Sequence, residues 1–429
     1  MNQTTAADSA ERALSIFPAG SNGEFNLPWD LVRVVARGEG CRLWDSAGRA
    51  YLDMSMGWGS VLVGHARPEV VEAVARQAAQ GLNFAAVTEP ALRLAEEIRR
   101  AAPFCERLRF CASGTEATAT CQRLARAATG RPKLLKFEGA YHGANEVGVT
   151  SLFPHAPPPF PAPDTTGGGL APLVGDTLLV APFNDLATSE RVVAANAAEL
   201  AGVIVEPLQR CTPPRPGFLE GLRALCDRHG LVLIFDEVVT GFRLAYGGAA
   251  AHYGVKPDLV AYGKALGGGA PIGAFGGKAE ILDLVREDRL GRDDYVWTAS
   301  TLGGNPVSCA AALAALEIYR RPGTYERLHA LGARLRAGMA ATLERQGQRG
   351  QVIGDGPLGQ VVFSDRPVTD YRSTKAGDAA TGRALMLGLF ERGIWLNPMG
   401  TKLYLSIAHD EAAVDEFLGR FEEALVGLA

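Results

Sequence analysis

The sequence predicts an α/β protein with a mostly parallel central sheet flanked by helices, and with a smaller α+β domain built from the two termini. Through the middle of the 429 residues, short apolar runs alternate with stretches of helical periodicity, a pattern typical of a parallel sheet with crossover helices. The alternating pattern of the sequence is interrupted at 320–323, where two arginines precede proline and glycine. We therefore expect an N-terminal segment that joins the small domain (1–60), a large domain (61–320) and a C-terminal small domain (321–429).

In the first half of the chain, the spacing of apolar residues and the positions of glycine and proline predict the elements in order. A turn at 45–48 separates two short strands within 34–53. The motif Ser113-Gly114-Thr115 forms a tight turn between a strand and a helix, and Gly130 ends that helix. The expected helices are 68–80, 92–101 and 116–129, and the expected strands are 108–111 and 133–137.

The second half begins with a stretch rich in proline and glycine, 151–182, which has little periodicity. We expect it to be either a disordered excursion or, over 151–175, a lid above a site. Beyond it, the large domain should hold strands at 201–205, 231–235 and 259–262 and helices at 217–229 and 306–319. The small domain should hold helices near 324–347, 378–392 and 410–427 and strands near 351–363 and 394–407.

The composition is that of an ordinary globular protein and excludes several classes. The net charge of -4 comes from interspersed signs, so we expect neither a nucleic-acid partner nor an anionic membrane. The seven cysteines are scattered without a C-x-x-C pair, which argues against a disulfide framework and against a metal site. The first twenty residues hold no apolar core of a signal peptide, and no run approaches membrane-spanning length. We expect a soluble, cytoplasmic protein.

The turn Ser113-Gly114-Thr115 has the chemistry of an anion site. It joins a strand to a helix N-terminus, where free backbone N–H groups and the helix dipole attract negative charge. The alternative is that Ser113 and Thr115 only cap the helix, which is the commoner use of such residues.

Two further residues come at the ends of apolar strands. Asp236 follows the most strongly apolar strand of the chain, and carboxyl ends of buried parallel strands are where α/β proteins bind ligands. Lys264 follows the next strand, 259–262, and glycines surround it in the sequence through position 277. A partly desolvated lysine of this kind can form an imine with a carbonyl. The alternatives are an aspartate that caps a turn and a lysine that is solvated.

Together, an anion-binding turn, a carboxylate and an imine-forming lysine at one sheet edge match the demands of pyridoxal phosphate. This cofactor needs a phosphate site, an acidic partner for its pyridinium nitrogen and a lysine for its aldehyde. The joint occurrence is far less expected by chance than any one motif, so we expect a pyridoxal 5'-phosphate enzyme.

At these same residues the sequence resembles the class III (subgroup II) aminotransferases of fold type I, in the family's order and over nearly the whole chain. Within that class, WDSAGRAYLDM (44–54) and LYLSIAHD (403–410) look most like glutamate-1-semialdehyde aminomutase and its aminotransferase relatives. The matching motifs are SGTEA (113–117), AYHG (140–143), VEP (205–207), FDEVVTGFR (235–243), YGKALGGGAPIGAFGG (262–277) and TLGGNP (301–306).

The resemblance implies a role for each matching residue. Lys264 would bind the cofactor's aldehyde and act as general base, and Asp236 would keep the pyridine nitrogen protonated. Val238 would pack behind the ring, and Tyr141 would stack on its other face unless it is a core aromatic. His142 would lie beside the cofactor or serve only as a structural neighbour of Tyr141.

The resemblance also implies how the phosphate and the substrate side are bound. Ser113, Gly114 and Thr115 would hold the phosphate, and Thr301 would reach the phosphate of the other subunit, which implies a homodimer with shared active sites. Glu206 and Gln209 would lie near the ring oxygen.

The chain departs from the aminomutase at the positions that bind the substrate. The segment 18–28 lacks the arginine that binds the aminomutase substrate's carboxylate, and 399–402 lacks its glutamate. Arg210 and Lys402 are candidate replacements, unless they are solvated charges. Trp58 and Phe25, with Trp395, would line an apolar pocket mouth unless they serve packing.

These departures favour transfer of an amino group between two molecules. We expect a transaminase that moves it from a primary amine, a β-amino acid or an amino-bearing specialised metabolite to a keto acid such as pyruvate. The alternative on the same scaffold is an intramolecular aminomutase or a racemase. A non-catalytic cofactor-binding protein would need the lysine or the aspartate to be missing, and both are present.

Overall fold

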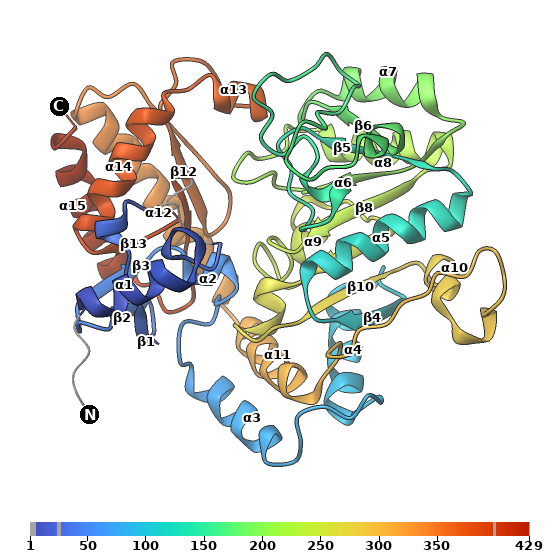
Figure 1. The fold of residues 1–429 in the computed structure, drawn as a ribbon, viewed down its shortest axis with the longest axis horizontal. Coiled ribbons are helices and arrows are strands. Elements are labelled where there is room, and N and C mark those ends of the chain that lie inside the picture. Colours follow the sequence, from blue (N-terminus) through green and yellow to red (C-terminus); the bar gives the residue numbers. More distant parts are fainter. Residues whose placement is uncertain (1–5, 24–26, 398–399, 429) are drawn as a thin grey trace. The chain divides into compact units, whose positions relative to one another are not determined.

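The computed structural model describes residues 6–23, 27–397 and 400–428. The chain forms two compact units (Figure 1). The terminal unit comprises the chain up to Pro68 together with Pro322–Val368 and the chain from Arg372 onward. The central unit comprises Glu69–Arg321 and the three residues Thr369–Tyr371.

The central unit is built on a seven-stranded sheet in the order β4-β10-β9-β8-β7-β5-β6. The five strands from β9 to β6 are parallel, and β10 runs antiparallel to both of its neighbours. The expected mostly parallel sheet is confirmed. The strands are β4 Arg107–Cys111, β5 Lys133–Phe137, β6 Leu178–Ala181, β7 Leu200–Val205, β8 Val232–Glu237, β9 Leu259–Tyr262 and β10 Gly273–Gly277.

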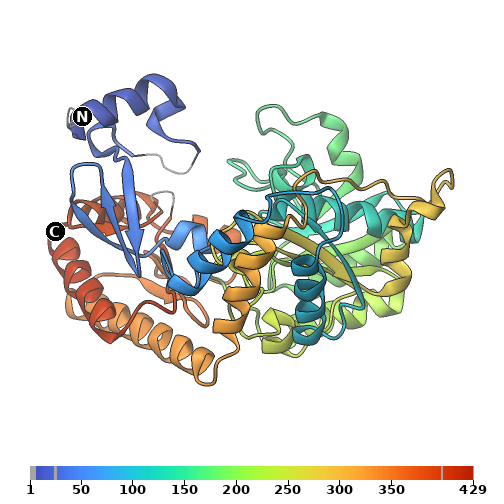
Figure 2. The same cartoon turned by 90° about the horizontal axis from the view of Figure 1, so that it is seen from below.

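Helices cover this sheet (Figure 1 and Figure 2). Helix α5 packs along β4 and β7 to β10, while α7 and α8 contact β6, β7 and β8. The apolar side chains alternate along the strands, so that Val232 and Ile234 join the cluster under α5. The helices are α3 Pro68–Ala78, α4 Glu89–Ala101, α5 Gly114–Thr129, α6 Glu146–Val149, α7 Leu186–Asn196, α8 Phe218–His229, α9 Gly248–Tyr253, α10 Ala279–Leu282 and α11 Pro306–Tyr319.

Two strands of the sheet were not predicted from the sequence. β6 lies in the stretch expected to be irregular, and β10 lies in the glycine-rich run after Lys264. In β10 the glycines are required by close packing, since a Cβ at Gly273 would lie 2.3 Å from the Ser113 carbonyl oxygen and one at Gly276 would lie 2.3 Å from Cys105 Sγ. Apolar periodicity cannot identify a strand whose side chains are missing for this reason.

The terminal unit has two small sheets, β1-β2-β3-β13 and β11-β12-β14. The segment 34–53 forms three strands, one more than predicted. The strands are β1 Val35–Glu39, β2 Arg42–Asp45, β3 Ala50–Asp53, β11 Gln351–Ile353, β12 Leu358–Val362, β13 Ile394–Trp395 and β14 Lys402–Tyr404. The helices are α1 Ala6–Ile16, α2 Met56–Gly59, α12 Thr324–Arg345, α13 Tyr371–Lys375, α14 Ala379–Glu391 and α15 Glu411–Val426.

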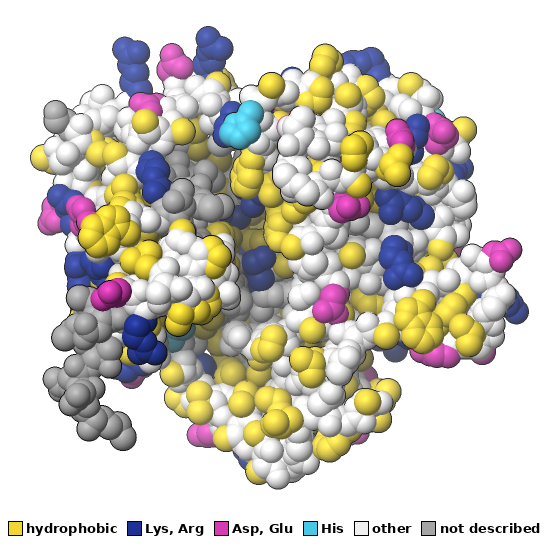
Figure 3. Space-filling model, viewed as in Figure 1, with side chains coloured by type: hydrophobic (Ala, Val, Ile, Leu, Met, Phe, Trp, Pro, Cys, Tyr) yellow, Lys and Arg dark blue, Asp and Glu magenta, His cyan; other side chains and the backbone are white. Residues whose placement is uncertain are grey.

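The surface carries charges of both signs. On the face drawn in Figure 3, basic and acidic side chains are interspersed, in keeping with the small net charge. None of the helices in the described ranges combines the length and the apolar character that crossing a bilayer requires.

Candidate active site

The turn before α5 presents backbone donors at the carboxyl edge of the sheet. Ser113 is the N-cap, and its Oγ accepts a hydrogen bond of 3.2 Å from the Glu116 N–H. The capping role left open for Ser113 is therefore real. Gly114 and Thr115 begin the first turn of the helix. Their N–H groups have no helical carbonyl four residues back, so they remain available to an anion. The Thr115 hydroxyl accepts from the Ala144 N–H at 3.2 Å and keeps its own proton to donate.

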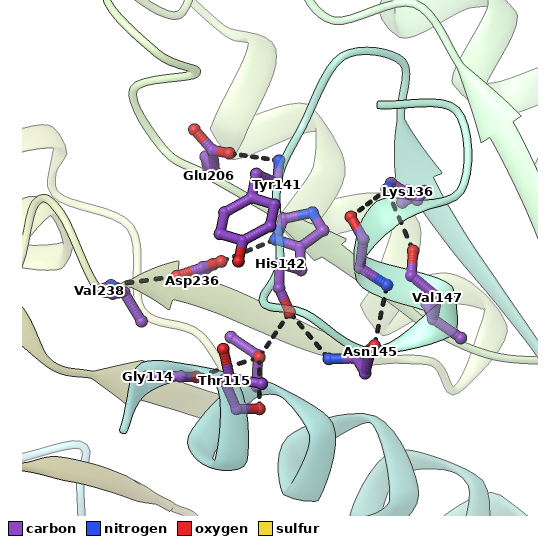
Figure 4. A network of polar contacts seen from close by, with 12 residues as sticks. Gly114, Thr115, Lys136, Tyr141, His142, Asn145, Val147, Glu206, Asp236 and Val238 are labelled. Atoms are coloured by element: carbon purple, nitrogen blue, oxygen red, sulfur yellow. Dashed lines mark hydrogen bonds and ion pairs between the residues drawn. The ribbon is translucent and has the colours of Figure 1, made fainter. Parts of the chain in front are cut away.

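Asp236 ends β8 and is paired with a buried histidine (Figure 4). Its Oδ2 lies 2.7 Å from Nδ1 of His142, and its Oδ1 accepts the Val238 N–H at 3.1 Å. Asp236 is 4% exposed and His142 is fully buried. Because the carboxylate can only accept, Nδ1 of the imidazole carries the proton in this contact. The pair holds an acidic group in a fixed orientation away from water.

Glu206, just after β7, organises the neighbouring loop. Its Oε1 accepts the Tyr141 N–H at 2.8 Å (Figure 4). Its Oε2 accepts the Arg210 N–H at 2.9 Å. Tyr141 is 37% exposed. Gln209 is buried and donates from Nε2 to the Glu138 carbonyl at 2.6 Å. One carboxylate thus holds the backbone of two segments that the sequence separates by more than sixty residues.

Lys264 follows β9, the strand beside β8, where Asp236 pairs with Ala261. It is half-buried, and its backbone is in the left-handed region at φ 44°. Such outliers among non-glycine residues cluster at functional sites. Nearby, Gly114 packs closely against Val238: a Cβ added at Gly114 would lie only 2.7 Å from Val238 Cγ1. A Cβ at Gly263 would lie 3.4 Å from Gly114 Cα, so these three residues approach one another closely.

Lys136 is part of this region and was not predicted from the sequence. It is fully buried in β5 and donates to the carbonyls of Val147, Gly148 and Thr150 at 3.1, 3.0 and 2.7 Å. Burial lowers its pKa to about 7. The only signal in the sequence was a lysine between Leu135 and Phe137 in the second half of a short strand. Lys136 ties the segment after Tyr141 and His142 to the sheet.

The residues present fit pyridoxal phosphate. Two buried polar atoms, His142 Nε2 and Gln209 Oε1, have no hydrogen-bond partner within the described ranges, an arrangement that a bound polar group would relieve. The helix start at Gly114 and Thr115 suits the phosphate. Asp236 suits a ring nitrogen that carries a proton.

Three further residues were predicted as site residues. Thr301 is exposed, and its carbonyl accepts from Asn83 Nδ2 at 2.9 Å. Trp58 belongs to the terminal unit, where it is half-buried with φ 57°. Phe25 lies outside the described residues. The lid expected over 151–175 stays a prediction.

Comparison with known proteins gives a consistent family. The family model described as aminotransferase class-III matches residues 28–425. A glutamate-1-semialdehyde 2,1-aminomutase from Roseiflexus castenholzii is 40% identical over 428 residues, covering 96% of this chain and 95% of the relative. An omega-transaminase from Sphaerobacter thermophilus is 36% identical, with a TM-score of 0.92 and coverage of 99% and 98%. A transaminase with PLP bound is 30% identical, with a TM-score of 0.89 and coverage of 100% and 98%.

These matches bear out the resemblance at the level of fold, enzyme class and cofactor. The matched proteins do not agree on the reaction. The curated relatives carry the aminomutase name, which agrees better with the alternative than with the expected transamination. The solved structure of the omega-transaminase carries the transaminase name.

Proposed function

The chain belongs to the class III aminotransferases, whose cofactor is pyridoxal phosphate, and we propose that it transfers an amino group from a primary amine or a β-amino acid to a keto acid such as pyruvate. The observation that carries the proposed chemistry is the placement of Asp236 and Lys264 at the same end of two adjacent parallel strands. The observation that favours two separate substrates is the sequence itself, which lacks arginine in 18–28 and has no glutamate in 399–402.

We assign the phosphate to the backbone donors of Gly114 and Thr115 and to the Thr115 hydroxyl. Val238 and Tyr141 would hold the cofactor ring, Asp236 would bind its nitrogen and Gln209 would bind its ring oxygen. Support comes from the tight approach of Gly114 to Val238 and from the unpaired Gln209 Oε1. Glu206 orients Tyr141 by accepting its backbone N–H.

When bound, pyridoxal phosphate supplies an aldehyde carbon that accepts an amine and a ring that withdraws electrons from the substrate Cα. Lys264 Nζ would hold that aldehyde carbon, and it would also act as the general base for the substrate's Cα proton. His142 donates to Oδ2 of Asp236 and the Val238 N–H donates to its Oδ1, so this carboxyl group is held in the orientation in which it would meet the ring nitrogen.

A homodimer is part of this proposal. The segments around Asn83 and Thr301 meet through their hydrogen bond, and both carry large apolar side chains that are more than half exposed. Exposed apolar residues gathered on adjoining segments mark a surface that another protein covers. We propose that a second copy covers them and that Thr301 reaches the partner's phosphate. The side chains are Leu82, Phe84, Val87, Trp297 and Leu302.

The second candidate is the intramolecular aminomutase, which the name of the curated relatives favours. It would use the same lysine and aspartate, and the two functions differ in whether the first product leaves. A transaminase releases a carbonyl product and needs a separate acceptor, whereas an aminomutase retains its intermediate and needs none.

The test follows the visible absorption of the cofactor-loaded enzyme with single amino donors and no acceptor. Transamination predicts loss of the lysine-bound cofactor band, stoichiometric release of a carbonyl product, and recovery of the band on adding pyruvate. Conversion of glutamate-1-semialdehyde to 5-aminolevulinate at many turnovers, without an acceptor and without release of a carbonyl product, would instead establish the aminomutase.

A further inference from the structure

Arg210 has a backbone conformation that glycine would adopt more easily. It lies in a tight turn in which the Thr212 N–H donates to the Gln209 carbonyl at 2.8 Å, and its φ is 60°. Glu206 Oε2 holds the conformation through the Arg210 N–H. These are backbone contacts that any residue could make. A strained arginine at such a position therefore points to a use for its side chain.

The guanidinium lies next to the proposed cofactor site. Nε donates to the Gly139 carbonyl at 3.2 Å, and the guanidinium carbon is 5.9 Å from the ring centroids of both Tyr141 and Phe153. Within the described ranges the guanidinium forms no ion pair, and its buried Nη2 has no acceptor. An arginine carries five N–H donors in a fork that matches a carboxylate, and here part of that fork is unused.

Two aromatic side chains, Tyr371 and Phe153, lie near the guanidinium. The Tyr371 ring packs on Gly139, where a Cβ would lie 2.3 Å from the ring. Burial raises the pKa of Tyr371 to about 12, with Glu138 raising it further and Arg210 lowering it, so this phenol near Arg210 keeps its proton at neutral pH. Phe153 is 53% exposed, so moving its ring aside uncovers the guanidinium at little cost in buried area.

We propose that Arg210 binds the carboxylate of the substrate, beside Tyr141 and under Phe153. The substrate class is then amino carboxylates and keto acids, and an amine without a carboxylate is a poorer substrate. This inference rests on the proposed function, which it deepens by giving the acceptor's carboxylate a partner. It also explains how a chain without an arginine in 18–28 can still recognise an acid.

The competing explanation is that Arg210 is structural, joining the loop at Gly139 to the turn at 209–212. The substitution Arg210→Gly separates the two. It removes the guanidinium and relieves the left-handed backbone, whereas Arg210→Ala removes the guanidinium and keeps the strain. Arg210→Lys retains the charge without the fork. Arg215→Ala, at an exposed arginine five positions on, is the control for the change in net charge.

The experiment is a calorimetric titration of the cofactor-loaded protein. The two ligands are 3-phenylpropanoate and its neutral amide, neither of which reacts. We expect the wild type and Arg215→Ala to bind the carboxylate at least about tenfold more tightly than the amide. Arg210→Gly and Arg210→Ala should both lose this preference, with Arg210→Gly melting at the higher temperature. Arg210→Lys should recover part of it.

Two outcomes would overturn the proposal. The first is a wild type without preference for the carboxylate. The second is an Arg210→Gly variant that keeps the preference for the carboxylate. An Arg210→Gly variant that binds both ligands equally more weakly than the wild type, and melts at a lower temperature, would count the same way. Because neither ligand reacts, this result is independent of turnover. A carboxylate preference with no spectral conversion by any donor would refute the proposed function alone.

Discussion

Asp236 and His142 form a buried pair in which Oδ2 of the carboxylate lies 2.7 Å from Nδ1 of the imidazole. The histidine is on the loop after β5 and the aspartate is at the end of β8, ninety-four positions apart. Replacing His142 with Phe removes the donor and leaves the carboxylate short of one charge-assisted bond. We expect the cofactor dissociation constant to rise about 10- to 100-fold. Equilibrium dialysis with pyridoxal phosphate measures it, and an unchanged constant would contradict the role.

Lys264 is expected to be indispensable for the chemistry. Lys264→Ala should abolish the absorption band of the lysine-bound cofactor and lower kcat by about a thousandfold or more. The control is Lys256→Ala, at an exposed lysine of the same unit, which should keep both the band and the rate. A Lys264→Ala variant that retains the band would refute the assignment.

Gly114 is expected to admit no side chain. Gly114→Ala places a methyl group 2.7 Å from Val238 Cγ1 and should destabilise the protein by about 1–3 kcal/mol while weakening cofactor binding. Adding Val238→Ala makes room and should restore part of the stability, as urea unfolding would report. Gly168→Ala is the matched control, since nothing lies within 4 Å of the position that its added methyl group would take. Equal losses in the single and double variants would show that the contact does not matter.

Lys136 should make stability depend on pH. Burial lowers its pKa from the ordinary 10.5 to about 7, so between these values the unfolded chain binds more protons than the folded one. Stability from this group therefore rises as the pH increases from about 7, with a limiting slope of ~1.4 kcal/mol per pH unit. Urea unfolding of wild type and Lys136→Met from pH 7 to 9 measures the slope, which the variant should lack. Parallel curves would mean that Lys136 stays protonated.

The exposed apolar residues near Thr301 should hold the dimer together. Introducing a charge by Val87→Asp and Leu302→Asp should dissociate it and release cofactor, because a buried unpaired charge at an interface is costly. Leu173→Asp is the control, since Leu173 is 74% exposed and lies in a different segment, Pro172–Thr177. Sedimentation velocity gives the mass of each variant. A double variant that remains dimeric would place the interface elsewhere.

The parts of this fold that were predictable depend on local rules. The strand predicted at 259–262 coincides with β9, and the predicted helix 116–129 lies within α5 between Ser113 and Gly130, which has a left-handed φ of 68°. A cap, a stop and an apolar run each act within a few residues, so one sequence suffices to find them. For the same reason, the sequence alone showed that Asp236 and Lys264 each follow an apolar run.

Contacts between distant segments decided the rest. Two glycines of the strand β10 fit closely against Ser113 and Cys105. Its pairing partners on either side come from segments about 150 residues apart in sequence. Lys136 likewise makes its hydrogen bonds to the segment after His142 only once the sheet has formed. The same holds for the left-handed turn at Arg210, whose guanidinium keeps a donor without an acceptor. The sequence by itself determined which chemical groups stand at the ends of the strands. Only the tertiary structure decided which of them are buried, hydrogen-bonded or left with an unsatisfied donor or acceptor. Burial and hydrogen bonding depend on how segments distant in the sequence pack together.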